Sequence, residues 1–599
     1  MANLDALKAC LEPRFGVLAE SNTYQLTVIA HNSDVAVGDL FLLPCQRGPD
    51  RFYIFRSTQY ANVLNRTIEV NDVARNKLTM PDSYLAEDLR EEQLIELKGM
   101  VLGYSQYDSD TEAWTFHRPR RLPQHLTEVF LVDPRRNCVA EVMRELLGSQ
   151  LGEGLYVGDL LAGEQALRGV SVYLPPFALS HHIGVFGRTG SGKSNLMMVL
   201  LRSIMEYNRA AAGNDNVASA SILAIDPHDE LRTWHDASGG ADGVRGIVSG
   251  YSESEQRGLV APFYYLTAKQ MGRTGLEQRV HLSRADVTPD DLVSVMEFSE
   301  QQIAFANQFY AFHGEQWIGR LMMGDDGQEG DAAEEQGPEF LPGTVAAVQR
   351  RVGFLRHGHT RVFTRFDPEL GHAYDSTLPD ILCALESGRV VVVDTTLMTE
   401  LEQFLLSTIV ARVLFSLRKA LRSAESPAQL EREVRQALGN DEEQGQIGMR
   451  QLADELVHRI ERRELPYVQE ERLRTPEQLP FVNVVIEEAP SVLNPQRLRF
   501  GSVFRDISRQ GRKFGIGLTV VSQQVSEIDQ GVLTQINTEL IMSLGNENER
   551  REAVRNASAD LMGFERELQV MEKGQVIVTA TYKDVPLPVQ IPEYDRLME

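Results

Sequence analysis

The chain has 599 residues, 42% of them hydrophobic and 24% charged, which indicates a folded globular protein of about two to four domains. This composition excludes a disordered, collagenous or disulfide-rich secreted chain. The formal net charge of −25, from 60 basic and 85 acidic residues, excludes a protein coated with positive charge for nucleic acid, but it is compatible with a local basic channel.

Membrane and export signals are not found in the sequence. No apolar run approaches the roughly 18 residues that indicate a membrane-spanning helix, and MANLDALKACLEPRF at the N-terminus lacks the apolar core of a signal peptide. Cys10, Cys45, Cys138 and Cys383 lie far apart without CxxC spacing, which predicts neither a zinc site nor a disulfide framework. We therefore expect a cytoplasmic protein without a membrane segment.

The first 150 or so residues are predicted to form short strands. These segments are rich in Val, Ile, Leu and aromatic residues and are separated by turn residues: TYQLTVIAH (23–31), DLFLLPC (39–45), RFYIFRS (51–57) and GMVLGYS (99–105). Closely spaced short strands predict a small all-β domain, and we expect a barrel over residues 1–150. A polar, partly helical stretch at 82–98 is expected to be an insertion in this barrel.

From about residue 151 the pattern becomes α/β. The expected strands are IGVF (183–186), ILAI (222–225), VVVV (390–393), VNVVI (482–486), GLTVV (517–521) and LIMSL (540–544), with apolar helices at 195–207 and 401–421. This alternation predicts a largely parallel sheet covered on both faces, within a second domain of residues 151–592. Helical insertions are expected at about 285–380 and 424–475, and a short C-terminal tail at 593–599.

A phosphate-binding loop is the strongest motif of the chain. Gly187-Arg188-Thr189-Gly190-Ser191-Gly192-Lys193-Ser194 matches GxxxxGK[ST] at every fixed position, between an apolar strand and an apolar helix. We expect these residues and Asn195 to bind ATP, with Lys193 on the β- and γ-phosphates and Ser194 on Mg²⁺. The alternative is a chance glycine-rich turn, and the strand–loop–helix setting argues against it.

Two carboxylates follow the apolar strand VNVVI, namely Glu487 and Glu488. A P-loop enzyme needs one carboxylate at the end of a buried strand to hold Mg²⁺ and a second to polarise the attacking water. We predict Glu487 on the metal side and Glu488 as the catalytic base. The alternative is an exposed acidic strand end, which is less expected after so apolar a strand.

Polar residues also end other predicted strands. The cluster DPHDE (226–230) follows ILAI, and we expect Asp226 or Glu230 near the γ-phosphate rather than in an independent metal site. Asp394 follows VVVV (390–393) in the same way, and it either lies beside the nucleotide or only caps a loop. Gln523 follows GLTVV and is predicted to sense the γ-phosphate or to align the water, with a polar loop start as the alternative.

The segment RLRFGSVFRDISRQGRKFG (497–515) is strongly basic within an acidic chain. We expect Arg497, Arg499 and Arg505 to contact DNA phosphates, and Arg512 to act as an arginine finger on a neighbouring subunit's nucleotide. A solvated helix face is the alternative for part of the segment. A second basic cluster, at 350–366, is a weaker candidate for DNA contact.

Taken together, these motifs resemble the HerA family of hexameric DNA-translocating ATPases, within the HerA/FtsK group of RecA-like motors. The matching segments, in family order over about residues 155–592, are GRTGSGKS, IDPHDE, GRVVVVDTT, VVIEEAP, SRQGRKFGIGLTVVSQQ and MEKGQVIVTATYKDVPLPVQI. The β-rich start resembles the barrel that precedes HerA motor domains. The chain departs from the family pattern at Glu487, where aspartate is commoner, and at Asp229, where glycine is frequent.

The resemblance implies a RecA-like ATPase core in a homohexameric ring, with ATP between subunits and duplex DNA bound in a central channel without sequence preference. Such motors work with a nuclease, NurA-like in DNA-end processing and repair, and the barrel is expected to dock this partner. Relatives in anti-phage complexes, beside sirtuin-like or nuclease effectors, give an alternative function. A P-loop kinase or signalling NTPase is a third class, which the paired Glu, the terminal Gln and the basic segment disfavour.

Overall fold

The computed structural model describes residues 10–11, 13–22, 25–31, 34–45, 51–63, 94–212, 217–228, 231, 263–269, 277–323, 340–357, 362–439, 448–561 and 563–597. Contacts group the chain into two compact units. Unit 1 comprises Met1–Pro175, Phe186–Leu196 and Thr538–Glu593, and unit 2 comprises Pro176–Val185, Met197–Asn537 and Tyr594–Glu599. The domain boundaries expected from the sequence stay predictions.

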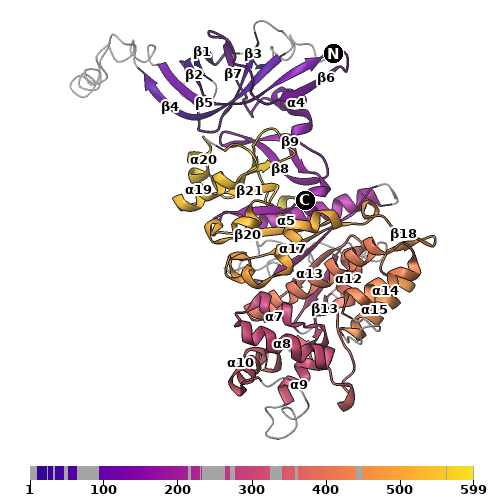
Figure 1. Ribbon diagram of the computed structural model, residues 1–599. Helices are drawn as coiled ribbons and strands as arrows, with labels where there is room; N and C mark the ends of the chain where they lie inside the picture. The colour runs from indigo at the N-terminus through magenta and orange to yellow at the C-terminus, as the bar shows by residue number, and fades with distance from the viewer. Residues whose placement is uncertain are drawn as a thin grey trace. The chain divides into compact units, whose positions relative to one another are not determined.

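The N-terminal part of unit 1 is a closed antiparallel barrel, as the sequence predicts (Figure 1). Six strands follow the order β2-β1-β7-β3-β4-β5, and pairing of β2 with β5 closes the ring. The strands are β1 (Gly16–Ser21), β2 (Gln25–Ala30), β3 (Leu40–Pro44), β4 (Arg51–Val63), β5 (Leu94–Asp108) and β7 (Glu128–Leu131), with β6 (Ala113–His117) added outside β5. Residues 94–98, expected in a partly helical insertion, belong to β5, and the rest of that insertion lies outside the described residues.

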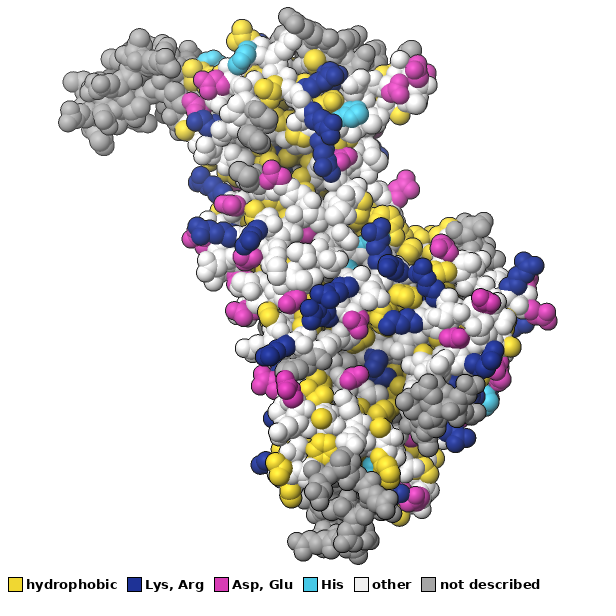
Figure 2. All heavy atoms as spheres, in the orientation of Figure 1, with side chains coloured by type: hydrophobic (Ala, Val, Ile, Leu, Met, Phe, Trp, Pro, Cys, Tyr) yellow, Lys and Arg dark blue, Asp and Glu magenta, His cyan; other side chains and the backbone are white. Residues whose placement is uncertain are grey.

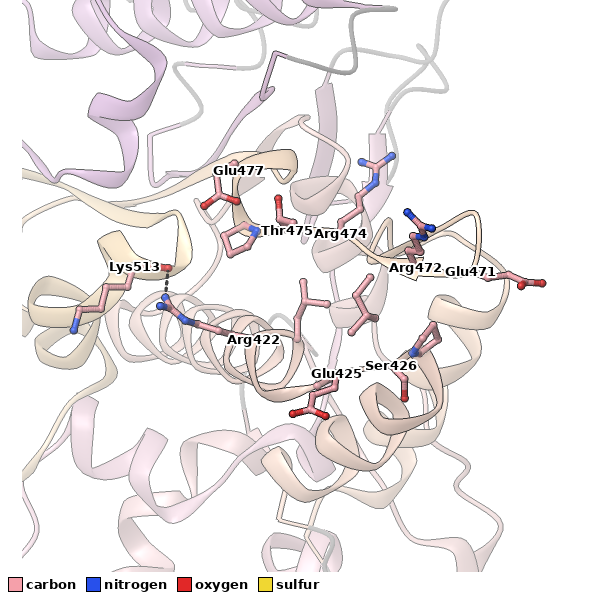
Figure 3. A pocket seen from close by; sticks show the side chains of 14 residues that line it. Arg422, Glu425, Ser426, Glu471, Arg472, Arg474, Thr475, Glu477 and Lys513 are labelled. Atoms are coloured by element: carbon pink, nitrogen blue, oxygen red, sulfur yellow. Dashed lines mark hydrogen bonds between the residues drawn. The ribbon is translucent and has the colours of Figure 1, made fainter.

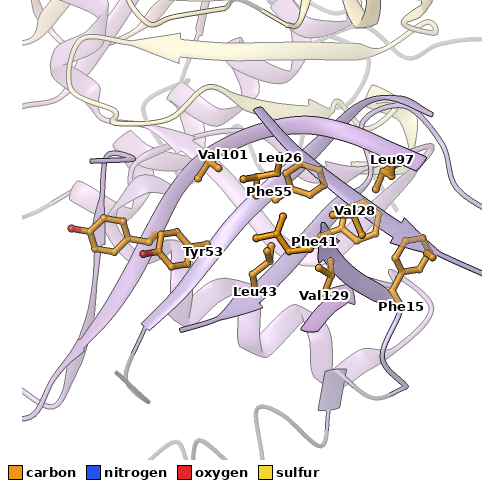
Figure 4. Packing of buried hydrophobic residues seen from close by; sticks show 13 residues of the cluster. Phe15, Leu26, Val28, Phe41, Leu43, Tyr53, Phe55, Leu97, Val101 and Val129 are labelled. Atoms are coloured by element: carbon orange, nitrogen blue, oxygen red, sulfur yellow. The ribbon is translucent and has the colours of Figure 1, made fainter. Parts of the chain in front are cut away.

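The barrel interior is filled by aliphatic and aromatic side chains (Figure 4). In β2, buried and partly exposed residues alternate along the strand, because successive side chains of a strand point to opposite faces. The ring of Phe41 packs between those of Phe15 and Phe55, with centroids 4.9 and 5.6 Å away. Such tilted aromatic pairs stabilise a core beyond the area they bury.

A disulfide joins Cys10 to Cys138, with Cα atoms 6.0 Å apart, so the expectation of no disulfide is wrong for this pair. Cys138 lies at the start of helix α4 (Asn137–Leu147), which follows the barrel. The bond spans 128 residues, and only the closed fold brings its two ends together. Because disulfides persist mainly in oxidising compartments, the cytoplasmic location stays a prediction. Within the described part of the chain, no helix combines the length and apolarity needed to cross a bilayer.

The remainder of unit 1 is an antiparallel sheet of N- and C-terminal strands. Its order is β21-β22-β23-β8-β9. The strands are β8 (Leu155–Ala162), β9 (Gln165–Leu174), β21 (Thr538–Met542), β22 (Gln575–Ala580) and β23 (Leu587–Gln590). Helices α19 (Glu547–Asn556) and α20 (Glu565–Val570) lie between β21 and β22 in the chain.

Unit 2 contains the sheet that five of the six apolar runs predict. The sixth run, LIMSL (540–544), overlaps β21, which belongs to unit 1 and pairs antiparallel with β22. The order of the unit 2 sheet is β13-β12-β16-β11-β19-β20-β10, and all neighbouring pairs from β13 to β20 are parallel. The strands are β10 (Ile183–Phe186), β11 (Ala220–Asp226), β12 (Phe263–Thr267), β13 (Glu277–Arg279), β16 (Val390–Asp394), β19 (Phe481–Ile486) and β20 (Ile516–Ser522). Every residue of β11, β16 and β20 is buried, as expected for parallel strands covered on both faces.

Helices surround this sheet and form the excursions from it. The long helix α13 (Glu400–Ser423) begins at a capping box in which Thr399 and Glu402 satisfy each other's backbone N–H groups. Residues between β14 (Leu282–Ser283) and β16 form α7 (Pro289–Val295), α8 (Glu300–His313), α9 (Trp317–Met323), α10 (Pro342–Val352), α11 (Phe354–His357) and α12 (Leu378–Glu386). After α13 come α14 (Pro427–Ala437), α15 (Arg450–Glu461) and the small hairpin of β17 (Val468–Gln469) and β18 (Arg472–Leu473).

We expect acid to destabilise unit 2 because of His182, which lies just before β10. It is 4% exposed, and its Nδ1 accepts a hydrogen bond from Leu518 N at 3.1 Å. Burial lowers the pKa of His182 from 6.5 to about 4. Between pH 6.5 and pH 4 the unfolded chain binds a proton at His182 that the folded chain does not bind. The contribution of His182 to the free energy of unfolding is therefore fully present above pH 6.5 and is lost as the pH falls toward 4. We expect the free energy of unfolding to fall by about 3 kcal/mol over this pH range because of His182.

Urea denaturation at several pH values measures this effect. The His182→Gln variant should show a smaller fall in the free energy of unfolding between pH 6.5 and pH 4 than the wild type. His458→Gln, at an exposed histidine of α15, is the matched control and should keep the wild-type slope. An unchanged slope for His182→Gln would contradict the assignment.

Candidate nucleotide and nucleic-acid sites

The loop between β10 and α5 (Lys193–Ala211) has the backbone of a phosphate cradle. Gly190 and Gly192 have φ values of 78° and 106°, in the left-handed region that only glycine adopts without strain. Such turns direct neighbouring N–H groups into one concavity that suits an anion. A Cβ added to Gly190 would meet no atom within 4 Å, so the loop is open at that position. The loop therefore fits a bound phosphate.

Lys193 is held over this loop. Its Nζ donates hydrogen bonds to Gly187 O at 2.8 Å and Arg188 O at 3.2 Å. Ser191 is buried and its Oγ lies 3.7 Å from Met542 Sδ, so this residue faces inward. Arg188, Thr189, Gly190 and Ser194 are exposed. The side chains that would contact a nucleotide are thus on the open side of the loop.

Three backbone groups of the C-terminal segment hold the loop from behind. Arg188 N donates to Ser543 O, and Gly574 N donates to Ser191 O, each at 2.9 Å. The Asn195 amide, predicted as a nucleotide contact, donates to Pro592 O at 2.9 Å and thereby supports the first turn of α5. Sequence reasoning missed Ser543, Gly574 and Pro592. The available signal was the C-terminal segment MEKGQVIVTATYKDVPLPVQI, which contains Gly574.

In unit 2, the predicted acidic and amide residues lie along one edge of the parallel sheet. Asp226 and Asp394 are register partners at the ends of β11 and β16, and Ile486 and Val520 pair near the ends of β19 and β20. The residues that follow β19 and β20 therefore continue the same edge. Such an edge, at the carboxyl ends of parallel strands, is where α/β proteins place their ligands.

Glu488 has a strained backbone at this edge. Its φ is 46°, its side chain is exposed, and Ala489 N donates to Val521 O at 3.1 Å just beyond it. A non-glycine residue in the left-handed region costs about 1–2 kcal/mol. Such strain persists where the surrounding structure holds it, often at functional sites. Glu487, the residue before it, is half-buried.

Asp226 and Asp394 are largely used within the fold. Asp226 is 3% exposed and accepts hydrogen bonds from His228 N at 3.3 Å and Leu231 N at 2.8 Å, which shapes the turn after β11. Glu230, its predicted companion, lies outside the described residues.

Asp394 is the centre of a small polar cluster. It accepts a hydrogen bond from Thr267 Oγ1 at 2.7 Å and from Thr396 N at 3.0 Å, and it pairs with Lys269 Nζ at 3.2 Å. Burial raises the pKa of Asp394, but the bonds from Thr396 and Thr267 outweigh it and lower the value. Of the two interpretations of Asp394, the loop cap is the one its contacts support.

Gln523 follows β20 at the start of a fixed turn and is half-buried. Ser522 Oγ donates to Gln524 O at 3.0 Å, and Gln524 N donates back to Ser522 Oγ at 2.9 Å. This exchange fixes the backbone on both sides of Gln523, which a sensor of phosphate requires.

The basic segment forms η7 (Arg497–Phe500), α17 (Val503–Gln510) and η8 (Gly511–Phe514), and Figure 2 shows Lys and Arg side chains gathered over the part of unit 2 where α17 lies. Arg499 is exposed, whereas Arg497 and Arg505 are half-buried. Arg505 Nη1 donates to Leu498 O at 3.1 Å. Arg497 Nη1 is buried and has no hydrogen-bond partner among the described residues. Of the three predicted DNA contacts, Arg499 is therefore the most accessible.

Arg512 is exposed in the short helix η8. Burial and then the positive charge of Arg512 lower the pKa of His181 to about 4. The neighbouring Lys513 lines a pocket of about 630 Å³ (Figure 3), in which Arg422 Nη1 donates to Lys513 O at 2.9 Å. Both glutamates and basic residues line this pocket.

The glycine cradle, the parallel sheet and the acidic strand end define a RecA-like P-loop ATPase fold. Residues 155–413 match the family model described as the central domain of helicase HerA. The predicted resemblance to the HerA family is thereby confirmed over these residues.

Curated relatives agree with this assignment. The DNA double-strand break repair helicase HerA of Pyrococcus furiosus is 22% identical over 70% of this chain and 66% of its own length. A probable helicase of the same description from Methanocaldococcus jannaschii is 22% identical over 77% of this chain and 80% of its own length. Another probable helicase of that organism is 32% identical, but only over 19% of this chain and 22% of its own length.

Solved structures are more distant. The bacterial conjugative coupling protein TrwB is 12% identical over 70% of this chain and 87% of its own, with a TM-score of 0.41. VirB4 of Thermoanaerobacter pseudethanolicus is 12% identical over 75% of this chain and 99% of its own, with a TM-score of 0.37. The fold assignment therefore rests on the strand order and the P-loop of this chain.

Proposed function

We propose that this protein is an ATP-driven, homohexameric translocase of double-stranded DNA that works with a partner nuclease in DNA end processing. The observation that carries the proposal is the open glycine cradle at Gly190 and Gly192, with Lys193 held over it. The strained carboxylate turn at Glu488 and the basic segment, in which Arg499 is exposed, support hydrolysis coupled to DNA.

Each residue has a defined part in this proposal. The loop N–H groups hold the phosphates, and Lys193 stabilises the negative charge of the β- and γ-phosphates. Glu488 accepts the proton of the attacking water. Mg²⁺, when bound, neutralises phosphate charge, with Ser194 and Glu487 as its oxygen donors.

ATP hydrolysis measured with and without DNA tests this function. We expect duplex DNA of any sequence to stimulate turnover, because a translocase couples the two. A wild-type protein that hydrolyses ATP without any response to DNA would favour a signalling NTPase instead.

DNA contact through Arg499 predicts a change in salt dependence. Each phosphate contact that is lost should lower the slope of log affinity against log salt by about 0.9 for duplex DNA. We expect Arg499→Ala to show this change, and Arg505→Ala to show less because its guanidinium already bonds Leu498 O. Arg555→Ala, at an exposed arginine of α19, is the control. An unchanged slope for Arg499→Ala would move the DNA site to the second basic cluster at 350–366.

The barrel is the proposed docking site of the nuclease. After β6 it exposes Leu122 and Leu126, 45% and 73% accessible, beside the exposed Arg120 and Arg121. An apolar surface bordered by cations suits an acidic, partly apolar partner. Identification of the protein that co-purifies with the full chain distinguishes a nuclease from a defence effector.

A further inference from the structure

The P-loop is clamped by a glycine that is itself fixed on both sides. Gly574 N donates to Ser191 O at 2.9 Å, while Gly574 O accepts hydrogen bonds from Ile591 N at 2.8 Å and Gln590 Nε2 at 3.2 Å. Its φ is 82°, and a Cβ on Gly192 would lie 3.3 Å from Gly574 N. A displacement of Gly574 must therefore displace the second half of the P-loop.

The same glycine is tied to the barrel through α20, which ends only a few residues before it. In α20, Glu567 O accepts a hydrogen bond from Met571 N at 2.9 Å, and the Glu567 carboxylate receives both Nε, at 3.0 Å, and Nη2 of Arg56. Arg56 lies in barrel strand β4 and is 1% exposed. Its guanidinium also packs 5.7 Å from the centroid of the Phe564 ring.

This ion pair is enclosed on its other side by Gly38 of the barrel and by Leu161 of β8. A Cβ on Gly38 would lie 2.7 Å from Arg56 Nη2, and Arg56 Nη1 reaches Leu161 O at 3.4 Å. Breaking a buried pair leaves an uncompensated charge in a low-dielectric interior, so a bidentate pair in this setting does not open readily. Strand β4 and helix α20 are therefore expected to move together.

A second connection joins the hairpin of β22 and β23 to the segment after the barrel. Lys583 Nζ donates to Gln150 O at 2.5 Å, and Asp584 N donates to Gln150 Oε1 at 2.6 Å. Asp584 also pairs with Arg118 Nε, on the chain after β6, at 2.8 Å. Both ends of β22, the strand that follows Gly574, are thus connected to the N-terminal part of unit 1.

We propose that Glu567 is a positioning residue for the P-loop. Through Arg56 and Gly574, it fixes the position of this loop relative to barrel strand β4. Nucleotide affinity then depends on the position of β4. By linkage, a partner that shifts the barrel alters nucleotide affinity, and nucleotide alters the affinity for that partner by the same factor. The inference rests on the proposed function in one respect, namely that the P-loop binds ATP.

Binding of a non-hydrolysable ATP analogue with Mg²⁺ to the full chain, measured by calorimetry, tests this inference. We expect Glu567→Gln to weaken binding about fivefold or more and to speed hydrogen exchange of the amides of residues 187–192. Arg56→Met combined with Glu567→Leu removes both charges, so it avoids a buried unpaired charge and carries the test if Glu567→Gln fails to fold. The control replaces Arg14 and Glu128 by Ala, an exposed ion pair on the same barrel.

The outcomes separate the inference from the proposed function. Unchanged affinity and unchanged P-loop exchange in the folded apolar double variant would overturn the positioning role. Weaker binding in that variant but not in the Arg14 and Glu128 control would support it. Lys193→Ala, measured alongside, reports on the proposed function, because wild-type binding by that variant would mean that the P-loop does not hold ATP.

Discussion

Glu488→Gln is expected to lower ATP turnover by about 10²–10⁴-fold, the usual contribution of a general base, while ATP binding survives. The amide keeps the size of the side chain but cannot accept the proton of the attacking water. The exposed position of Glu488, two residues after the end of β19, supports this role. Single-turnover hydrolysis and analogue binding, measured on the same preparation, separate chemistry from affinity. Wild-type turnover by Glu488→Gln would refute the assignment.

Glu488→Gly provides a second measurement at the same position. The φ of 46° is strained for glutamate and relaxed for glycine, so this variant should be about 1 kcal/mol more stable than the wild type. It should also be as inactive as Glu488→Gln. A gain of stability together with a loss of hydrolysis would show that the strain is retained for function. Ser491→Ala, in the adjacent helix α16 (Pro490–Leu493), is a control that leaves the carboxylate in place.

The sheet of unit 2 was predictable because its strands are buried on both faces. Runs such as VVVV (390–393) and GLTVV (517–521) contain only residues that a covered parallel strand accepts, and β16 and β20 occur where these runs predict them. The barrel was predictable for a related reason, since its strands are short, apolar and closely spaced. Strands β1, β6 and β7 were missed because their exposed residues mask the alternation.

The supports of the P-loop were not predictable, because they depend on contacts between distant parts of the chain. GxxxxGKS identifies the loop by itself, but nothing local in the sequence connects Ser191 with Gly574 or Arg56 with Glu567. For the same reason, the disulfide between Cys10 and Cys138 was not predicted from the sequence. Local patterns identify elements and motifs, whereas pairings over hundreds of residues emerge only when the sheets close.

The basic segment shows a further limit of sequence reasoning. Arg497, Arg499 and Arg505 are equivalent cations in the sequence, but only Arg499 is exposed in the structure. Phe504 and Ile507 are buried on one face of α17, which sets the rotation of that helix and therefore the burial of Arg505. Charge can be counted from sequence, but its accessibility is decided by packing.

Arg512→Ala is expected to reduce ATP turnover by about 10³-fold or more if this residue acts as an arginine finger across a subunit boundary. Arg512 suits this role because it is exposed in η8, immediately before β20, whose far end leads to Gln523. A guanidinium supplied in trans makes each nucleotide site depend on its neighbour, so one variant subunit disables a site that is otherwise intact. Increasing amounts of Arg512→Ala protein mixed into wild-type protein should therefore reduce activity more steeply than dilution does. Arg509→Ala, at an exposed arginine of α17, is the matched control, and a proportional loss for Arg512→Ala would place its effect within its own subunit.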